Sequence, residues 1–83
     1  MSGTIIVYGR EGCPACENTM RALTIAGVPA RYVDVDAEPA AAELLRAAGA
    51  RQLPYVRLPD GSAWTGLRLD KIVELRRERL AAA

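Results

Sequence analysis

Short apolar runs and helix-forming segments alternate along this chain. Residues 4–8 form a near-continuous β-branched run, which is typical of a strand buried on both faces of a sheet. Residues 31–36 alternate between apolar and polar side chains and predict a second strand. Residues 54–58 and 63–64 flank the turn signal at residues 59–62, so they predict a hairpin of two further strands.

Three helices are predicted between and after these strands. The first begins at Pro14, where a first-turn proline belongs, and ends by residues 27–29. The second begins near Pro39 and ends at Gly49, and the third covers residues 69–80. The positions expected to face the core are Cys16, Met20, Leu23 and Gly27 in the first helix, Leu44, Leu45 and Ala48 in the second, and Ile72, Val73 and Leu80 in the third.

The order of these elements predicts an α/β fold. A strand–helix–strand start implies a parallel pair with a right-handed crossover, and the hairpin near the end adds antiparallel strands. We therefore expect a mixed four-stranded sheet with helices on both faces, in the order βαβαββα. The chain has 83 residues, which is room for one small domain, so residues 1–83 are expected to form a single domain.

Composition removes several kinds of chemistry. The absence of His excludes imidazole bases, Cys–His dyads and His metal ligands. With 11 basic and 10 acidic residues, the net charge of +1 gives no reason to expect a nucleic-acid partner. The first residues lack a basic region and a long apolar run, so we expect a cytoplasmic protein with no membrane partner.

The strongest candidates for chemistry are Cys13 and Cys16, which lie between a predicted buried strand and a predicted helix. Cys13 falls at or just before the helix start, where unpaired backbone N–H groups and the positive end of the helix dipole stabilise a thiolate. Cys16 lies one turn further on, close enough to form a disulfide and pointed inward. We expect Cys13 to attack and Cys16 to resolve the resulting mixed disulfide. Pro14 pre-sets the helix angle, and the small Ala15 leaves the pair open to a protein partner.

Three other interpretations of the cysteine pair remain at this point. The pair could be half of a zinc site, but tetrahedral zinc needs four ligands, and the chain has neither a second pair nor a His. A zinc ion or iron–sulfur cluster could instead be shared across a dimer. Two unrelated core cysteines are the third alternative. Within a single chain we expect no metal site.

Residues 7–16, Val-Tyr-Gly-Arg-Glu-Gly-Cys-Pro-Ala-Cys, resemble the active-site entry of glutaredoxins in the thioredoxin superfamily. The resemblance extends over nearly the whole chain and implies a thioredoxin-like fold. Pro54 falls where that superfamily carries its cis-proline, which implies a cis bond between Leu53 and Pro54. It also implies that the backbone of Leu53 offers hydrogen bonds to a bound partner chain.

Residues 64–70, Trp-Thr-Gly-Leu-Arg-Leu-Asp, are similar to the W-S-G-F-R-P-D signature of NrdH-redoxins, glutaredoxin-like proteins that supply electrons to ribonucleotide reductase. Thr65, Leu67 and Leu69 replace Ser, Phe and Pro of that signature. The resemblance implies a dithiol oxidoreductase and electron carrier with a redox-active Cys13–Cys16 disulfide. It further implies a monomer without a bound cofactor, reduced by thioredoxin reductase with electrons from NADPH. Its expected target is ribonucleotide reductase, which serves deoxyribonucleotide synthesis, or another protein disulfide.

Glutathione is the alternative electron donor. Arg10 occupies the place of a basic residue that glutaredoxins use for the glutathione carboxylate, although it could equally be a solvated loop charge. Ala15 stands where glutaredoxins have an aromatic residue, and only Gly66, followed by Leu67, stands where they have two glycines. These departures favour thioredoxin reductase. A cluster-binding dimer held through Cys13 and a non-catalytic interaction domain are alternatives of other classes, the second opposed by the intact cysteine pair.

The remaining residues of the second motif have structural as well as binding interpretations. Trp64 either packs within the hairpin or faces a partner. Arg68 and Asp70 form a surface pair that favours the start of the last helix, and Thr65 could join them in a hydrogen-bonded lock beside Pro54. The candidate residues for partner or substrate binding are Arg10, Pro14, Ala15, Leu53, Pro54, Trp64, Thr65, Gly66, Leu67, Arg68 and Asp70.

Overall fold

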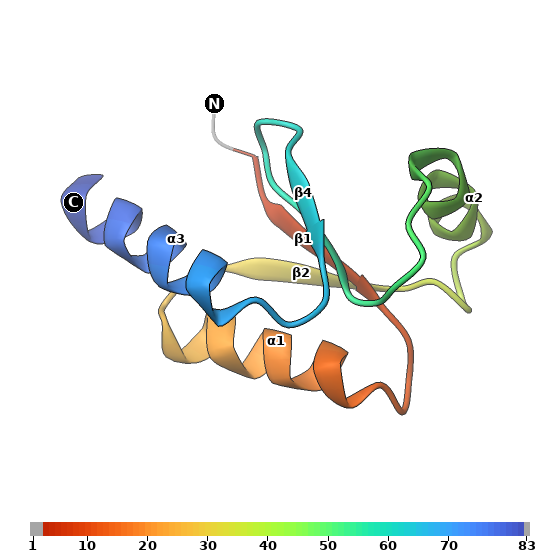
Figure 1. Cartoon of the computed structure of the whole chain (residues 1–83), viewed down its shortest axis with the longest axis horizontal. Coiled ribbons are helices and arrows are strands. Elements are labelled where there is room, and N and C mark those ends of the chain that lie inside the picture. The colour runs from red at the N-terminus through yellow and green to blue at the C-terminus, as the bar shows by residue number, and fades with distance from the viewer. Residues whose placement is uncertain (1–2, 83) are drawn as a thin grey trace.

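A computed structural model describes residues 3–82 of the chain. The elements are β1 (Ile5–Gly9), α1 (Pro14–Ile25), β2 (Ala30–Asp34), α2 (Pro39–Ala48), β3 (Tyr55–Arg57), β4 (Ala63–Thr65) and α3 (Leu69–Ala82), as labelled in Figure 1. The predicted βαβαββα order is therefore confirmed. Within residues 3–82, no helix combines the length and the apolar character needed to span a membrane.

The strands form one mixed sheet in the order β2-β1-β3-β4. β1 runs parallel to β2, with Val7 opposite Tyr32. On its other side β1 runs antiparallel to β3, which forms the predicted antiparallel hairpin with β4. β1 lies inside the sheet, and its side chains pack into buried cores on both faces, as predicted from the run of β-branched residues.

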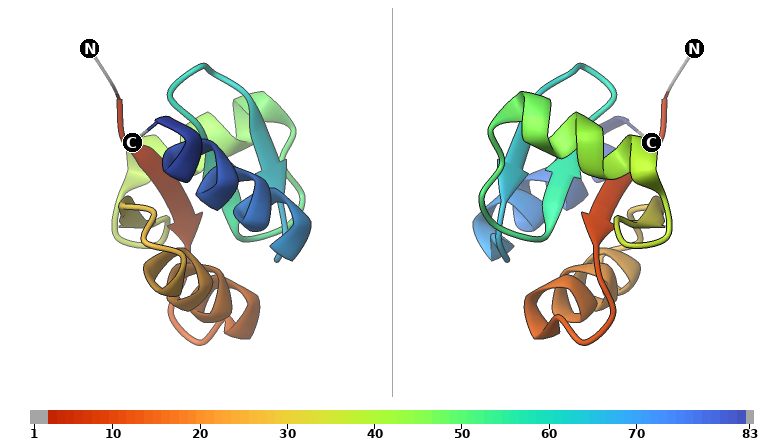
Figure 2. Two further views of the ribbon diagram at one scale, coloured as in Figure 1. Left: turned by 90° about the vertical axis from the view of Figure 1, so that its left-hand side faces the viewer. Right: turned by 90° about the vertical axis from the view of Figure 1, so that its right-hand side faces the viewer.

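Helices cover both faces of this sheet, as predicted. Figure 2 shows α3 in front of the sheet from one side and α2 in front of it from the opposite side. On the face of α1 and α3, the buried core includes Val7, Leu23, Val56 and Ile72. On the other face, a second core contains Tyr8, Val35, Ala41 and Leu45. Val7 and Tyr8 belong to different cores because successive residues of a strand point to opposite faces.

The inward-facing residues of the helices are confirmed for the most part. Cys16, Leu23, Leu45 and Ile72 are buried, and Met20 and Leu44 are half-buried against the two cores. In α1 the sequence analysis missed Thr19, which is completely buried. Its hydroxyl donates a hydrogen bond to the carbonyl of Ala15 at 2.7 Å, so this buried polar group is satisfied.

Four of the predicted core positions are wrong. Gly27 is exposed because α1 has already ended at Ile25, and Ala48 is exposed at the last residue of α2. In α3, Val73 and Leu80 are 55% and 63% exposed. The face of α3 that meets the core is set by Ile72 together with the half-buried Leu75, three residues further on, and Val73 lies off that face. Leu80 lies in the last turns of α3, which extend away from the sheet in Figure 1.

β2 ends at Asp34, two residues before the predicted end. The Asp34 carboxylate accepts a hydrogen bond from the backbone N–H of Asp36 at 2.9 Å, and the Asp34 carbonyl accepts one from Ala37 at 3.1 Å. This local turn competes with continuation of the strand. Its consequence is that Asp36 leaves the sheet and faces the loop that follows β1.

Candidate functional site

Cys13 is the N-cap residue of α1, in an extended backbone conformation, and Pro14 follows at the first helical position. The Cys13 sulfur accepts a hydrogen bond from the backbone N–H of Cys16 at 3.2 Å. The two cysteines form a disulfide, and their Cα atoms lie 5.2 Å apart, within the ordinary range for such a bond. The sulfur of Cys13 therefore takes the place that a Ser or Asp oxygen takes at many helix starts.

Two residues in the preceding loop set this helix start. Gly12 has a φ of +79°, a left-handed conformation that favours glycine and turns the chain out of β1. Pro14 has no backbone N–H, so it costs nothing at a position where that group would have no partner in the helix. Gly12 and Pro14 thus make α1 begin directly after Cys13, which places the Cys13 sulfur at the free N–H groups of the helix start.

The two sulfurs differ in their access to solvent. Cys16 is completely buried, whereas Cys13 is half-buried. Pro14 beside them is exposed and Ala15 half-buried. An incoming disulfide can therefore reach Cys13 from outside, whereas Cys16 is reached only from Cys13.

Other predicted residues lie at the end of the sheet where β1 ends and the loop to Cys13 begins. Gly9 lies opposite Asp34, and the pairing of Tyr8 with Tyr55 places Pro54 across from Gly9. The backbone N–H of Gly66 donates to the carbonyl of Pro54 at 2.8 Å, which joins the β4–α3 loop to the same end. The Leu53–Pro54 peptide bond is cis, as the resemblance implied.

Gln52 lies in the loop between α2 and β3, and the sequence analysis gave it no role. The Thr65 hydroxyl donates to the Gln52 side-chain oxygen at 3.5 Å. A Cβ on Gly66 would lie 3.2 Å from the Gln52 side-chain nitrogen, and Gly66 has a φ of +82°. Gln52 therefore packs directly against the β4–α3 loop, and its place two residues before Pro54 was the only signal for it in the sequence.

Arg68 and Asp70 form the predicted surface pair. The Arg68 guanidinium donates two hydrogen bonds to the Asp70 carboxylate, at 3.0 and 2.8 Å. These bonds hold the pKa of Asp70 below its ordinary value and raise the pKa of Arg68. The three-residue lock is wrong in one member: Thr65 bonds to Gln52 instead, because its hydroxyl lies on the side of β4 that faces the Pro54 loop.

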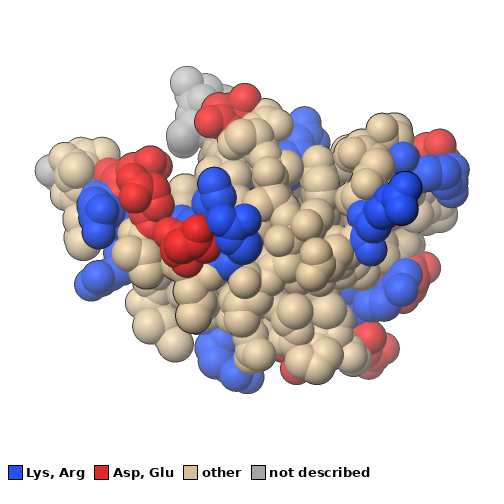
Figure 3. All heavy atoms as spheres, in the orientation of Figure 1, with Lys and Arg blue, Asp and Glu red and all other residues tan. Residues whose placement is uncertain are grey.

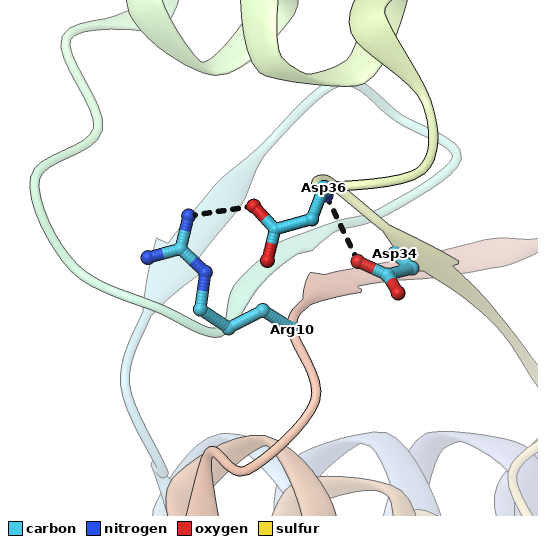
Figure 4. A network of polar contacts seen from close by, with 3 residues as sticks. All are labelled: Arg10, Asp34 and Asp36. Carbon is cyan, nitrogen blue, oxygen red and sulfur yellow. Dashed lines mark hydrogen bonds and ion pairs between the residues drawn. The ribbon is translucent and has the colours of Figure 1, made fainter.

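Arg10 lies in the loop after β1 and is paired with Asp36 at 3.1 Å, while the Asp34 carboxylate holds the backbone of Asp36 in place (Figure 4). Both members of the ion pair are more than half exposed. Arg10 also lines a cavity of about 340 Å³ together with Arg51. Arg10 is thus a paired loop charge on the wall of a cavity next to the cysteine loop.

Trp64 and Leu67 differ in exposure. Trp64 is 9% exposed and packs in the core with Val56 and Ile72, so the structure shows the hairpin-packing role. Leu67 is 38% exposed, and Leu69 after it is 57% exposed. The apolar surface of this loop therefore comes from the two leucines. On the face drawn in Figure 3, charged side chains of both signs surround an uncharged area near the middle.

Tyr32 is a further residue of the site that the sequence analysis missed. A Cβ on Gly9 would lie 2.7 Å from the Tyr32 hydroxyl oxygen and 2.8 Å from the Cys16 sulfur. Gly9 therefore leaves the space in which the hydroxyl approaches the buried sulfur. Burial and the charge of Asp34, in that order, raise the pKa of Tyr32. Only the alternation of β2, which places Tyr32 on one face with Val7, could have pointed to it.

The residues that the structure describes contain no group of three or more His, Cys, Asp or Glu side chains placed to hold a metal ion. The chemistry that the described geometry supports directly is the formation and opening of one disulfide, at a sulfur that caps a helix.

Comparison with known proteins gives a consistent result. The sequence model of the family described as Glutaredoxin matches residues 5–62. The chain is 44% identical over 72 residues to the glutaredoxin-like protein NrdH of Salmonella typhimurium, covering 87% of this chain and 88% of the relative. It is 45% identical over 71 residues to the same protein of Escherichia coli, covering 86% of each.

Solved structures confirm the thioredoxin-like fold. The NrdH-redoxin from Escherichia coli, a glutaredoxin-like protein with a thioredoxin-like activity profile, superposes with a TM-score of 0.82 at 42% identity. The superposition covers 88% of this chain and 95% of that protein. A glutaredoxin from Methanosarcina mazei superposes with a TM-score of 0.76 at 31% identity, covering 89% of this chain and 78% of that one.

Proposed function

The chain belongs to the glutaredoxin family, and we propose that it carries electrons from a thioredoxin reductase to ribonucleotide reductase or another protein disulfide. It is a small thiol–disulfide oxidoreductase similar to NrdH-redoxins, with Cys13 and Cys16 as its redox pair. We infer that it works as a cytoplasmic monomer with one domain and no bound cofactor, its electrons coming ultimately from NADPH.

The proposed cycle uses the difference between the two sulfurs. The Cys13 thiolate attacks one sulfur of the target disulfide, and the other target sulfur leaves as a thiolate that takes up a proton. The Cys16 thiol then loses its proton and attacks the Cys13 sulfur, which breaks the mixed disulfide and releases the second target thiol. Two electrons have passed to the target, and the Cys13–Cys16 disulfide returns to its reductase.

In this proposal, the partner protein binds to the surface around Cys13. Pro14 and Ala15 lie beside the sulfur, and Leu53 and Pro54 lie at the sheet end that faces the same loop. The backbone of Leu53 would pair with the extended segment that carries the target disulfide. Thr65, Gly66 and Leu67 complete this surface on the far side of Pro54.

The exposed side chain of Leu67 is the observation that carries the choice of electron donor. It stands where a second glycine would let the backbone approach glutathione closely, and it offers an apolar contact to a protein instead. The ion pair with Asp36 also offsets the charge of Arg10, which glutathione would need as an anchor. The thioredoxin-like activity profile of the Escherichia coli relative agrees with this choice.

The test compares NADPH consumption at equal concentrations of this protein, with thioredoxin reductase in one reaction and with glutathione plus glutathione reductase in the other. A disulfide target is present in both, and Cys13→Ser supplies the blank. We expect turnover mainly with thioredoxin reductase, and Leu67→Gly should raise the share that runs through glutathione. Turnover mainly through glutathione in the unmodified protein would refute the proposed donor and favour a glutathione-dependent glutaredoxin that uses the cavity beside Arg10 and Arg51.

A further inference from the structure

A tyrosine hydroxyl lies beside the buried sulfur of the redox pair. Tyr32 is opposite Val7 in the parallel pair of β1 and β2, so its ring lies on the sheet face that α1 covers. The Tyr32 oxygen and the Cys16 sulfur lie 2.7 and 2.8 Å from the same point, the position of a Cβ on Gly9. The two atoms are therefore no more than about 5.5 Å apart, a separation that one water molecule can span, and Tyr32 itself is 39% exposed.

We propose that the Tyr32 hydroxyl donates a hydrogen bond to the Cys16 sulfur, directly or through one water, when that sulfur becomes a thiolate in the resolving step. Cys16 is completely buried, and apolar surroundings oppose the thiolate that this step requires. A hydroxyl donor at the sulfur offsets part of that penalty, since hydrogen bonds to charged groups are the stronger ones. The proposal rests on Cys16 being the resolving thiol, and it is independent of the electron donor.

Burial and the nearby negative charges both favour the protonated, donor form of the Tyr32 hydroxyl. Burial is the first cause that raises the pKa of Tyr32, followed by the negative charges of Asp34, Glu17 and Asp36. Asp34 is the last residue of β2, and Asp36 lies in the turn after it, where it is paired with Arg10. Glu17 lies in the first turn of α1. At neutral pH the hydroxyl therefore keeps its proton and faces the thiolate as a neutral donor.

Tyr32 is a positioning residue in this step, because its hydroxyl keeps its own proton from start to finish. The Cys16 thiol gives its proton to water, and the resulting thiolate attacks the Cys13 sulfur. The bond between Cys13 and the target sulfur breaks, and the target sulfur leaves as a thiolate that takes up a proton. The Tyr32 hydroxyl holds the attacking sulfur until the new S–S bond has formed.

The experiment follows the reduced protein as it reacts with dithiobis(nitrobenzoate) in a stopped-flow instrument. The first release of coloured thiolate reports the attack by Cys13, and the second reports the attack by Cys16 on the mixed disulfide. In Tyr32→Phe, which keeps the ring, we expect the second phase to slow about tenfold at neutral pH. Its pH profile should move to higher pH, and the first phase should stay unchanged. Tyr55→Phe, which removes a hydroxyl from the ring packed against Tyr8, serves as the matched control and should alter neither phase.

The outcomes separate the proposal from its premise. A second phase in Tyr32→Phe with the rate and pH profile of the unmodified protein would overturn the role of Tyr32. Equal slowing at every pH, or equal slowing of both phases, would mean that the hydroxyl acts only through the local structure, and would overturn it as well. Absence of the second phase from the unmodified protein would instead refute Cys16 as the resolving thiol. Circular dichroism of both variants shows whether the fold is retained.

Discussion

The backbone N–H of Cys16 donates a hydrogen bond to the sulfur of Cys13 at 3.2 Å. Cys13 is the N-cap of α1 and Cys16 is its third helical residue, which is the spacing at which a capping side chain ordinarily accepts from the backbone. The same spacing brings the two sulfurs within disulfide range. A single helix start therefore places N–H groups at the sulfur of Cys13, the proposed attacking residue, and places Cys16, the proposed resolving residue, one turn further along α1.

Replacing each cysteine by serine should separate the two roles. Cys13→Ser keeps a good N-cap residue, so the protein should fold, but disulfide reduction should be abolished because the attacking sulfur is gone. Cys16→Ser should attack a target once and then hold it as a mixed disulfide on Cys13. Mass spectrometry of each variant after incubation with a peptide disulfide checks both outcomes. A stable adduct on Cys13→Ser rather than on Cys16→Ser would reverse the assignment.

Adding one methyl group at Gly9 should disturb the resolving sulfur. The Cβ in Gly9→Ala would lie 2.8 Å from the Cys16 sulfur and 3.0 Å from the Cys16 Cβ, so α1 or Tyr32 must shift. We expect a loss of about 1–3 kcal/mol in the free energy of unfolding, the usual cost of overpacking, together with slower release of the mixed disulfide. Urea denaturation and the stopped-flow assay measure the two effects.

Gly27→Ala is the matched control for this substitution. Gly27 has a φ of +72° and open space where its Cβ would be, at the far end of α1 from the cysteines. The free energy of unfolding should fall by about 1 kcal/mol through backbone strain, with both kinetic phases unchanged. Similar kinetics for Gly9→Ala and Gly27→Ala would show that contact at the Cys16 sulfur has no influence on the reaction.

Arg68→Gln should change how stability depends on acid. The hydrogen bond from Arg68 is the first cause that holds the pKa of Asp70 below its ordinary value. A carboxyl with a lowered folded-state pKa stabilises the fold above its unfolded-state pKa, and that contribution is lost as pH falls through the folded-state value. The variant should thus lose a small contribution at neutral pH, and the difference should vanish in strong acid. NMR titration of the Asp70 carboxyl tests this; an unchanged pKa in Arg68→Gln would contradict it.

The element order and the cysteine pair could be predicted because their signals are local. A β-branched run, a proline at a helix start and a turn-forming tetrapeptide each determine structure within a few residues. The roles predicted for Cys13 and Cys16 rest on the same helix start. The Leu53–Pro54 cis bond followed only from the family resemblance, since spacing alone says nothing about it.

The remaining features depend on contacts between distant segments. Tyr32 and Cys16 both lie against Gly9 only because β2 lies beside β1, and Thr65 bonds to Gln52 only because β4 returns past the Pro54 loop. The exposure of Val73 depends on which stripe of α3 meets the sheet, and several stripes of that helix carry apolar residues. Hydrophobic pattern alone could not choose between them.

The most direct test of the different roles of Cys13 and Cys16 is alkylation of the fully reduced protein. Limiting iodoacetamide is added over a range of pH, and mass spectrometry maps the labelled cysteine. Cys13 should be labelled first, because it is more accessible than Cys16. Its labelling should also persist at a lower pH, because the N–H groups at the start of α1 stabilise its thiolate. Cys16, which is completely buried, should be labelled slowly until the protein unfolds. Labelling of Cys16 before Cys13, or of both at the same rate, would contradict the assignment of Cys13 as the attacking thiol.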